Sequence, residues 1–206
     1  VGGIYVDVTY GGGGHSAEIL SRLSSKGALV AFDQDLDAEA NLSADSRLSF
    51  VRQNFSFYQN YLRALDKLPV DGVLADLGVS SHQFDVAERG FSFRFDAGLD
   101  MRMNRDTDLT AFDVVMNYDE DDLLRVFREY GELKNAYSIA SRIVYRRKDE
   151  VIDTIEKLKS ILESLAPRGK FNTFYAKVFQ ALRIEVNDEM GALREFLEKS
   201  TDVVKE

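Results

Sequence analysis

The chain has 206 residues, of which 45% are hydrophobic, so it is long enough to bury one substantial core with a smaller domain attached. It contains no cysteine, which excludes disulfides and thiolate metal sites and favours a reducing, cytoplasmic setting. The formal net charge of −9 argues against a protein that coats long stretches of nucleic-acid backbone, and no apolar run is long enough to span a membrane.

Four short apolar runs, separated by segments long enough for a helix, open the chain. The runs cover Ile4 to Val8, Ala28 to Phe32, Leu48 to Val51 and Val73 to Ala75, with helices expected at Ala17 to Leu23 and Phe57 to Leu65. Parallel strands need such crossovers, and strands covered on both faces have continuous apolar sequences. The residues up to about Ser81 therefore predict an open α/β sheet of the Rossmann-like type.

A glycine-rich string, Asp7-Val-Thr-Tyr-Gly-Gly-Gly-Gly-His-Ser16, lies between the first expected strand and the first expected helix. Glycines let the backbone approach a ligand closely, and the helix that follows offers free N–H groups. Asp33, at the end of the second strand, stands where a doubly wound fold places a carboxylate for ribose hydroxyls. The combination predicts a nucleotide-like cofactor, and its spacing fits both NAD and S-adenosylmethionine.

The fourth strand runs into Asp76-Leu-Gly-Val-Ser-Ser-His-Gln83. Ligands of open α/β sheets lie outside the carboxyl ends of the strands, so Asp76 is expected to face the same ligand as the glycine loop and Asp33. Its carboxylate suits a hydrogen bond from an amino group, and a helix-capping or turn role is the alternative. The two histidines, His15 and His82, lie in turn-like segments where local hydrogen bonds are commoner than catalysis, and no spacing of metal ligands appears.

Beyond Ser81 the pattern changes to an irregular stretch up to Asn104 and then to helices. Two amphipathic stripes, Leu123 to Tyr130 and Val151 to Leu165, predict helices of an inserted domain. A last helix is expected from about Asn187 back to the sheet. Because the sequence ends without another strand, we expect further strands of the sheet to come from residues outside it.

Basic and aromatic side chains are concentrated within this second part. Seven basic and two acidic residues lie between Arg125 and Lys148, and they form either a solvated helix face or a local patch for nucleic acid. Phe91, Phe93 and Phe95 alternate with Ser92 and Arg94, an arrangement that suits either stacking on nucleotides or packing at a domain junction.

Several strings together resemble one family, the bacterial small-subunit ribosomal RNA cytosine-N4 methyltransferases (RsmH/MraW type). Besides the glycine loop, they are Asp76-Leu-Gly-Val-Ser-Ser81 with Gln83, Glu88-Arg-Gly-Phe-Ser-Phe93, Leu99-Asp-Met-Arg-Met103, Tyr130-Gly-Glu132 and Phe179-Gln-Ala-Leu-Arg-Ile-Glu-Val-Asn187. The resemblance covers nearly the whole chain. The strings at Glu88 and Leu99 are far more specific than any glycine loop.

The resemblance implies a class I methyltransferase sheet with an inserted helical domain, and transfer of the methyl group of S-adenosylmethionine to N4 of a cytosine in the decoding region of 16S ribosomal RNA. The cofactor contacts that it implies are Gly13, Gly14, His15, Asp33, Phe55, Asp76 and Gln83, and Asp76 is also the candidate for catalysis. The implied domains are 1–83 for the cofactor, 84–177 for RNA recognition and 178–206 for a helix that returns to the sheet. The implied partner is small-subunit ribosomal RNA or the small subunit itself, with no metal and no membrane.

Two other functions remain open at this point. An NAD-dependent oxidoreductase accounts for the glycine loop and Asp33 but leaves Glu88 to Phe93 and Leu99 to Met103 unexplained. A non-catalytic RNA-binding module accounts for the strands that are expected outside the sequence. Phe55 likewise has two interpretations, because an aromatic side chain after the third strand either lies against a planar ring of the ligand or packs in the core.

Overall fold

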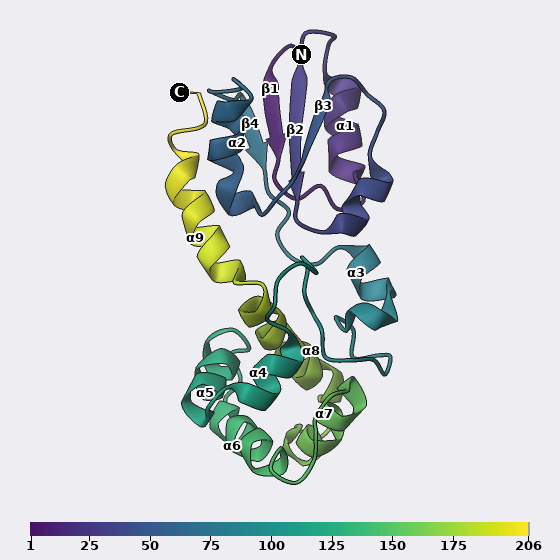
Figure 1. Cartoon of the computed structure of the whole chain (residues 1–206), viewed down its shortest axis with the longest axis vertical. Coiled ribbons are helices and arrows are strands. Elements are labelled where there is room, and N and C mark those ends of the chain that lie inside the picture. Colours follow the sequence, from purple (N-terminus) through teal and green to yellow (C-terminus); the bar gives the residue numbers. More distant parts are fainter. Residues whose placement is uncertain (206) are drawn as a thin grey trace. The chain divides into compact units, whose positions relative to one another are not determined.

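The computed structural model describes residues 1–205, and the chain divides into two compact units (Figure 1). The first unit comprises Val1–His82 together with the residues from Glu189 onward. The second unit comprises Gln83–Asp188. It is therefore inserted between two segments of sequence that fold together.

The first unit contains a parallel sheet of four strands in the order β3-β2-β1-β4. The strands are β1 (Ile4–Asp7), β2 (Ala28–Asp33), β3 (Leu48–Arg52) and β4 (Gly72–Leu74). In the register of the sheet, Val6 of β1 lies opposite Val30 of β2 and Val73 of β4. The predicted α/β sheet is confirmed, and its strand order reverses between β1 and β4, where doubly wound sheets bind their ligands.

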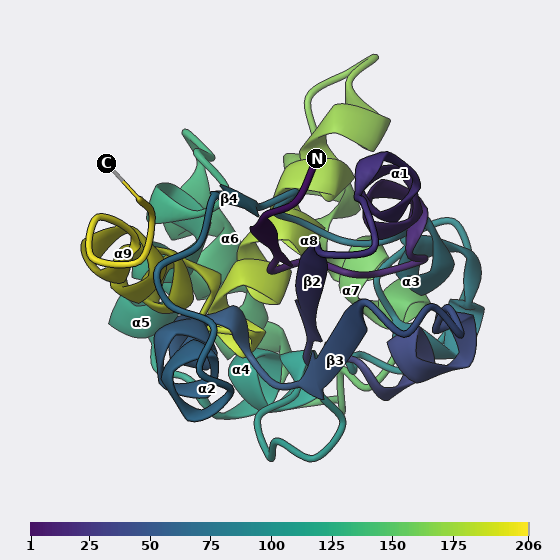
Figure 2. The same ribbon diagram turned by 90° about the horizontal axis from the view of Figure 1, so that it is seen from above.

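Helices cover both faces of this sheet, as Figure 2 shows for α1 on one side and α2 and α9 on the other. Alternate strand residues point to opposite faces. Phe32 packs in a buried cluster with Leu62 of α2 and Phe196 of α9, whereas its near neighbour Leu29 packs with Leu20 of α1 on the other face. The helices of this unit are α1 (Gly14–Arg22), η1 (Leu36–Asn41), η2 (Phe55–Phe57), α2 (Tyr58–Ala64) and α9 (Glu189–Ser200).

The second unit is helical and has its own core. Val114, Phe127, Ile139, Leu158 and Leu182, from five different helices, are completely buried. Helix α5 packs against α6 and α8, α4 packs against α8, and α6 packs against α7. The helices are α3 (Ser81–Asp85), which begins in the first unit, η3 (Ala87–Arg89), α4 (Ala111–Asn117), α5 (Glu120–Glu129), α6 (Ala136–Arg146), α7 (Ile155–Leu162), η4 (Glu163–Leu165) and α8 (Phe171–Val186).

The last helix, expected from about Asn187, is present as α9, which begins at Glu189 and follows the end of α8. Asn187 ends α8, and Asp188 has a left-handed backbone with φ of 45°, so the chain turns before α9 begins. The expected domain boundary at residue 177 falls inside α8, which belongs entirely to the second unit.

The last described residues lie beside β4. The backbone N–H of Val70 donates to the carbonyl of Val203, and the N–H of Lys205 donates to the carbonyl of Val70, both at 2.9 Å. The two segments form an isolated parallel bridge, which the Lys205 ammonium supports by an ion pair with Asp71 at 2.8 Å. The bridge lies at Val70, two residues before β4 begins, so the last described residues run beside the segment that leads into that strand.

Two kinds of feature are missing from residues 1–205. No helix there is both long enough and apolar enough to cross a membrane. The same residues contain no group of three histidine or carboxylate side chains placed to hold a metal ion.

Candidate cofactor site

Three carboxylates end three neighbouring strands of the sheet. Asp7 is the last residue of β1, Asp33 is the last residue of β2, and Asp76 follows β4 by two residues. Because these strands are adjacent and parallel, the three residues leave the sheet at one edge. Their environments differ, since Asp7 is completely buried, Asp33 is half-buried and the side chain of Asp76 is 71% exposed.

The buried carboxylate of Asp7 ties the glycine loop to the sheet. Its Oδ2 accepts a hydrogen bond from the Ser16 hydroxyl at 2.7 Å, and its Oδ1 accepts one from the backbone N–H of Thr9 at 3.0 Å. The Thr9 hydroxyl donates to the same Oδ1 at 3.4 Å and accepts a hydrogen bond from the backbone N–H of Asp76 at 2.8 Å. A chain of hydrogen bonds thus connects α1, β1 and Asp76. It also supplies the partners that the buried carboxylate of Asp7 needs.

The loop also depends on glycine for its backbone shape. Gly11 and Gly13 have φ angles of 51° and 78°, in the left-handed region that side chains disfavour. A Cβ on Gly13 would lie only 2.7 Å from the hydroxyl oxygen of the buried Tyr10, whereas a Cβ on Gly14 would meet nothing within 4 Å. Within residues 1–205, no side chain forms a capping hydrogen bond at Gly13, the residue before α1. The first N–H groups of the helix are therefore left for a ligand.

Asp33 is held by the same loop. Its Oδ2 accepts a hydrogen bond from the backbone N–H of Gly11 at 2.7 Å, and its Oδ1 accepts one from the N–H of Asp35 at 2.9 Å. Burial raises the pKa of Asp33, and the nearby carboxylates of Asp35 and Asp7 add to the rise, while the two backbone hydrogen bonds oppose it. A carboxylate has about four acceptor positions, so both oxygens retain capacity for ribose hydroxyls.

His15 and Asp76 meet across the loop. Nε2 of His15, the second residue of α1, lies 3.2 Å from Oδ2 of Asp76. Both side chains are mostly exposed, at 60% and 71%. The structure therefore brings together two predicted site residues that are 61 positions apart in the sequence.

The other predicted site residues have different surroundings. Phe55 begins η2 and packs edge-on against Phe196, with the ring centroids 5.8 Å apart. Gln83 is buried and belongs to the second unit. The second histidine, His82, has its Nε2 3.3 Å from Oδ2 of Asp37. The edge of the sheet thus gathers the glycine loop, His15, Asp33 and Asp76, whereas Phe55 lies against the core of the first unit.

The charges at this edge distinguish between the two cofactors that fit the glycine spacing. S-adenosylmethionine carries a sulfonium and an ammonium, whereas NAD carries an anionic pyrophosphate. The exposed carboxylate of Asp76 attracts a cationic ligand and repels an anionic one, whereas the position of Asp33 suits the ribose of either cofactor. The uncapped N-terminus of α1 suits a carboxylate group, which the methionine part of S-adenosylmethionine also has.

In the second unit, the two most specific strings of the sequence meet around one buried arginine. Nη2 of Arg89 donates to the backbone carbonyls of Arg102 and Met103, at 3.0 and 3.2 Å. The N–H of Met101 donates to the carbonyl of Arg89 at 3.0 Å. Asn187 completes the cluster, since its Nδ2 donates to the carbonyl of Met101 at 2.8 Å and its Oδ1 accepts from the N–H of Met103 at 2.7 Å.

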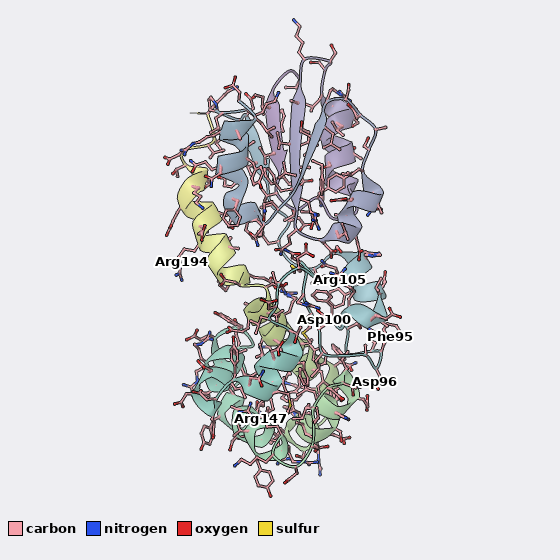
Figure 3. The ribbon with its side chains drawn as sticks, in the orientation of Figure 1. Phe95, Asp96, Asp100, Arg105, Arg147 and Arg194 are labelled. Carbon is pink, nitrogen blue, oxygen red and sulfur yellow. The ribbon has the colours of Figure 1, made fainter. Side chains whose placement is uncertain are left out.

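Figure 3 labels Asp100, which belongs to the second of these strings. Asp100 forms an ion pair with Arg102 at 2.8 Å. Burial acts to raise the pKa of Asp100, but the hydrogen bonds from Arg102 outweigh burial and lower that pKa. Phe93 lies between the rings of Tyr175 and Phe179, at centroid distances of 6.2 and 5.7 Å, so it packs within the unit.

Comparison with known proteins identifies a family and several relatives. The model of the MraW methylase family matches residues 1–206. The ribosomal RNA small subunit methyltransferase H of Flavobacterium psychrophilum is 54% identical over 202 residues, which are 98% of this chain and 69% of that protein. The proteins of the same name from Flavobacterium johnsoniae and Bacteroides thetaiotaomicron are each 55% identical over 203 residues, covering 98% of this chain and 67% of theirs.

Proposed function

This chain belongs to the MraW methylase family, and from that premise we propose that it transfers the methyl group of S-adenosylmethionine to the exocyclic N4 of a cytosine in the decoding region of 16S ribosomal RNA. The resemblance found in the sequence strings is confirmed by the family match over the whole chain and by relatives above 50% identity. That match is the observation that carries the proposal. It leaves a nicotinamide-dependent oxidoreductase and a non-catalytic RNA-binding module without support.

The residues at the sheet edge fit the cofactor as the family resemblance implies. Gly13, Gly14 and His15 provide the backbone of the loop and the N-terminus of α1, and the space beside Gly14 admits a close ligand. Asp33 retains acceptor capacity for the ribose hydroxyls. Phe55 and Gln83 remain proposed contacts that rest on the resemblance alone.

The chemical step needs positioning more than acid–base chemistry. S-adenosylmethionine supplies a methyl group that its sulfonium has already activated for in-line displacement. The protein has to hold the acceptor nitrogen in line with that methyl group and to exclude competing orientations. The chain of hydrogen bonds from Ser16 through Asp7 and Thr9 to Asp76 fixes the loop and the end of β4 with respect to each other.

We assign Asp76 to the acceptor amine. The lone pair of cytosine N4 is delocalised into the ring, and a carboxylate that accepts a hydrogen bond from N4 localises that lone pair toward the methyl group. The side chain of Asp76 is exposed, and the hydrogen bond from Thr9 to its backbone sets its position. Its contact with His15 gives the carboxylate a second constraint.

The variant Asp76→Asn tests this assignment by separating cofactor binding from methyl transfer. We expect near-normal affinity for S-adenosylmethionine in calorimetry and a large loss of turnover, because an amide accepts an N4 hydrogen bond without the charge. Asp66→Asn, an exposed aspartate of the same unit, is the control for the change in charge. Unchanged turnover would remove Asp76 from the chemistry, and lost cofactor binding would reassign it to the cofactor.

The acceptor is tested by nucleoside analysis of the product. Labelled S-adenosylmethionine is incubated with small-subunit RNA and with small subunits, and the labelled nucleoside is identified after digestion. N4-methylated cytidine is the expected product, and any other methylated nucleoside would overturn the acceptor assignment. Affinity for NAD without affinity for S-adenosylmethionine would overturn the proposed activity itself. A ribosomal RNA substrate implies that the reaction takes place in the cytoplasm.

A further inference from the structure

Helix α6 and its flanking residues concentrate positive charge in an acidic chain. Between Lys134 and Lys148 there are five basic residues and no acidic one, although the whole chain has a net charge of −9. Within residues 1–205, one of the five, Arg146, forms an ion pair with a carboxylate, that of Glu150. The other four positive charges of this segment have no acidic partner in that range.

Two of these four side chains are tied to neutral groups. Nη1 of Arg142 donates to the hydroxyl of Ser164 at 3.1 Å and to the carbonyl of Ile161 at 3.4 Å, and Nη1 of Arg147 donates to the carbonyl of Val115 at 2.8 Å. Figure 3 labels Arg147 beside the helices of this unit. Hydrogen bonds to neutral acceptors fix a guanidinium without cancelling its charge, so these contacts leave α6 electropositive.

The outer face of α6 carries two exposed tyrosines. Tyr137 and Tyr145 are 61% and 64% exposed, while Ile139, Ala140 and Ile143 on the other face are buried where α6 packs against α5 and α7. A helix rises about 1.5 Å per residue, so the two tyrosines stand about 12 Å apart along the axis. A single exposed aromatic residue is common on protein surfaces, but here two of them lie on the same basic face of one helix.

We infer that this α6 surface, defined as Lys134, Tyr137, Tyr145 and Lys148, binds a single-stranded segment of the ribosomal RNA substrate; the inference rests on the proposed function. Tyrosine rings stack on bases of any sequence, and lysines at both ends of the row attract the phosphates between those bases. Charge complementarity favours RNA over a protein partner, because RNA carries a negative charge on every nucleotide.

The first test replaces the aromatic rings. Tyr137→Ala/Tyr145→Ala is compared with Tyr137→Phe/Tyr145→Phe, which keeps the rings and loses only the hydroxyls. Stacking contributes about 1–3 kcal/mol per base, so each alanine should weaken binding of a labelled single-stranded ribosomal RNA oligonucleotide at least about five-fold. In methyl transfer to small-subunit RNA, the KM for RNA should rise, while kcat, affinity for S-adenosylmethionine and the circular dichroism spectrum stay as in the wild type.

The second test changes the charge. The slope of log affinity against log salt is negative. Lys134→Gln/Lys148→Gln should reduce its magnitude by about 1.4, since each phosphate contact on a single strand contributes about 0.7. Lys26→Gln, at an exposed lysine of the first unit, should leave the slope unchanged.

If the wild type methylates RNA and the alanine pair does so with an unchanged KM, the inference is wrong while the proposed function stands. Weaker RNA binding by the alanine pair with an unchanged salt slope for the lysine pair would show that Lys134 and Lys148 do not contact phosphates, and it would also overturn the inference for this surface.

Discussion

Replacement of Gly13 by alanine tests whether the loop is built for a left-handed turn at a crowded position. Gly13 has φ of 78°, and an added Cβ would lie 2.7 Å from Oη and 2.9 Å from Cζ of Tyr10. Tyr10 cannot move aside freely, because its ring packs against Phe50 and its hydroxyl donates to the carbonyl of Asn41. The left-handed backbone costs about 1–2 kcal/mol and overpacking costs about 1–3 kcal/mol, so the free energy of unfolding should fall by about 2–5 kcal/mol.

The matched control is Gly14→Ala, one residue further along the same loop. Its Cβ would meet nothing within 4 Å, so the free energy of unfolding should change by less than about 1 kcal/mol. The chain has no tryptophan, so urea unfolding is followed by circular dichroism. Gly14→Ala should nevertheless weaken binding of S-adenosylmethionine, because its methyl group occupies space beside the helix N-terminus. If the free energies of unfolding of Gly13→Ala and Gly14→Ala differ by less than about 0.5 kcal/mol, the steric argument is refuted.

Two further predictions concern the carboxylates. Burial raises the pKa of Asp33, so this group favours folding below its unfolded pKa and loses that contribution as pH rises through the folded one. Cofactor affinity should have the opposite trend, falling as the pH is lowered and Asp33 takes up a proton, and calorimetric titrations of Asp33→Asn should lack this pH dependence; a flat profile for the wild type would contradict it. Thr9→Val removes the hydroxyl between Asp7 and the N–H of Asp76, so methyl transfer should slow several-fold for a loss of about 1 kcal/mol, with Thr9→Ser close to the wild type. Steady-state rates that are equal for Thr9→Val and the wild type would exclude this positioning role.

The sheet is predictable from sequence because each strand is a continuous apolar run between polar segments. The start of the last helix near Asn187 is predictable as well, but the long-range contacts that Asn187 makes are not. Asn187 holds the backbone of Met101 and Met103 through its side chain, and the left-handed Asp188 follows directly. These contacts span more than 80 residues of sequence, and helical periodicity contains no sign of them.

The gathering of Asp33 and Asp76 beside the glycine loop was predictable, but the hydrogen bonds that connect these segments were not. Parallel strands end at one edge, so Asp33 and Asp76 could be placed beside the glycine loop before any coordinates. The role of Thr9 was missed, because its hydroxyl is bonded to the N–H of a residue 67 positions later. A local sign did exist, since Thr9 follows Asp7 by two residues at the end of a strand, where such pairs form side-chain turns.

The strings that carry the family resemblance lie mainly in the second unit, whereas most of the proposed cofactor contacts lie in the first. A loop of small residues at a helix N-terminus is shared by many nucleotide-binding proteins, since it needs only backbone freedom. The segment around Arg89 places stricter requirements on its sequence than the glycine loop does. The guanidinium of Arg89 is almost fully buried, and it donates hydrogen bonds to the carbonyls of Arg102 and Met103. A change in that backbone path would leave a buried charge with too few partners, which costs several kcal/mol. The packing of one buried charge therefore explains why these strings are more distinctive than the residues that hold the cofactor.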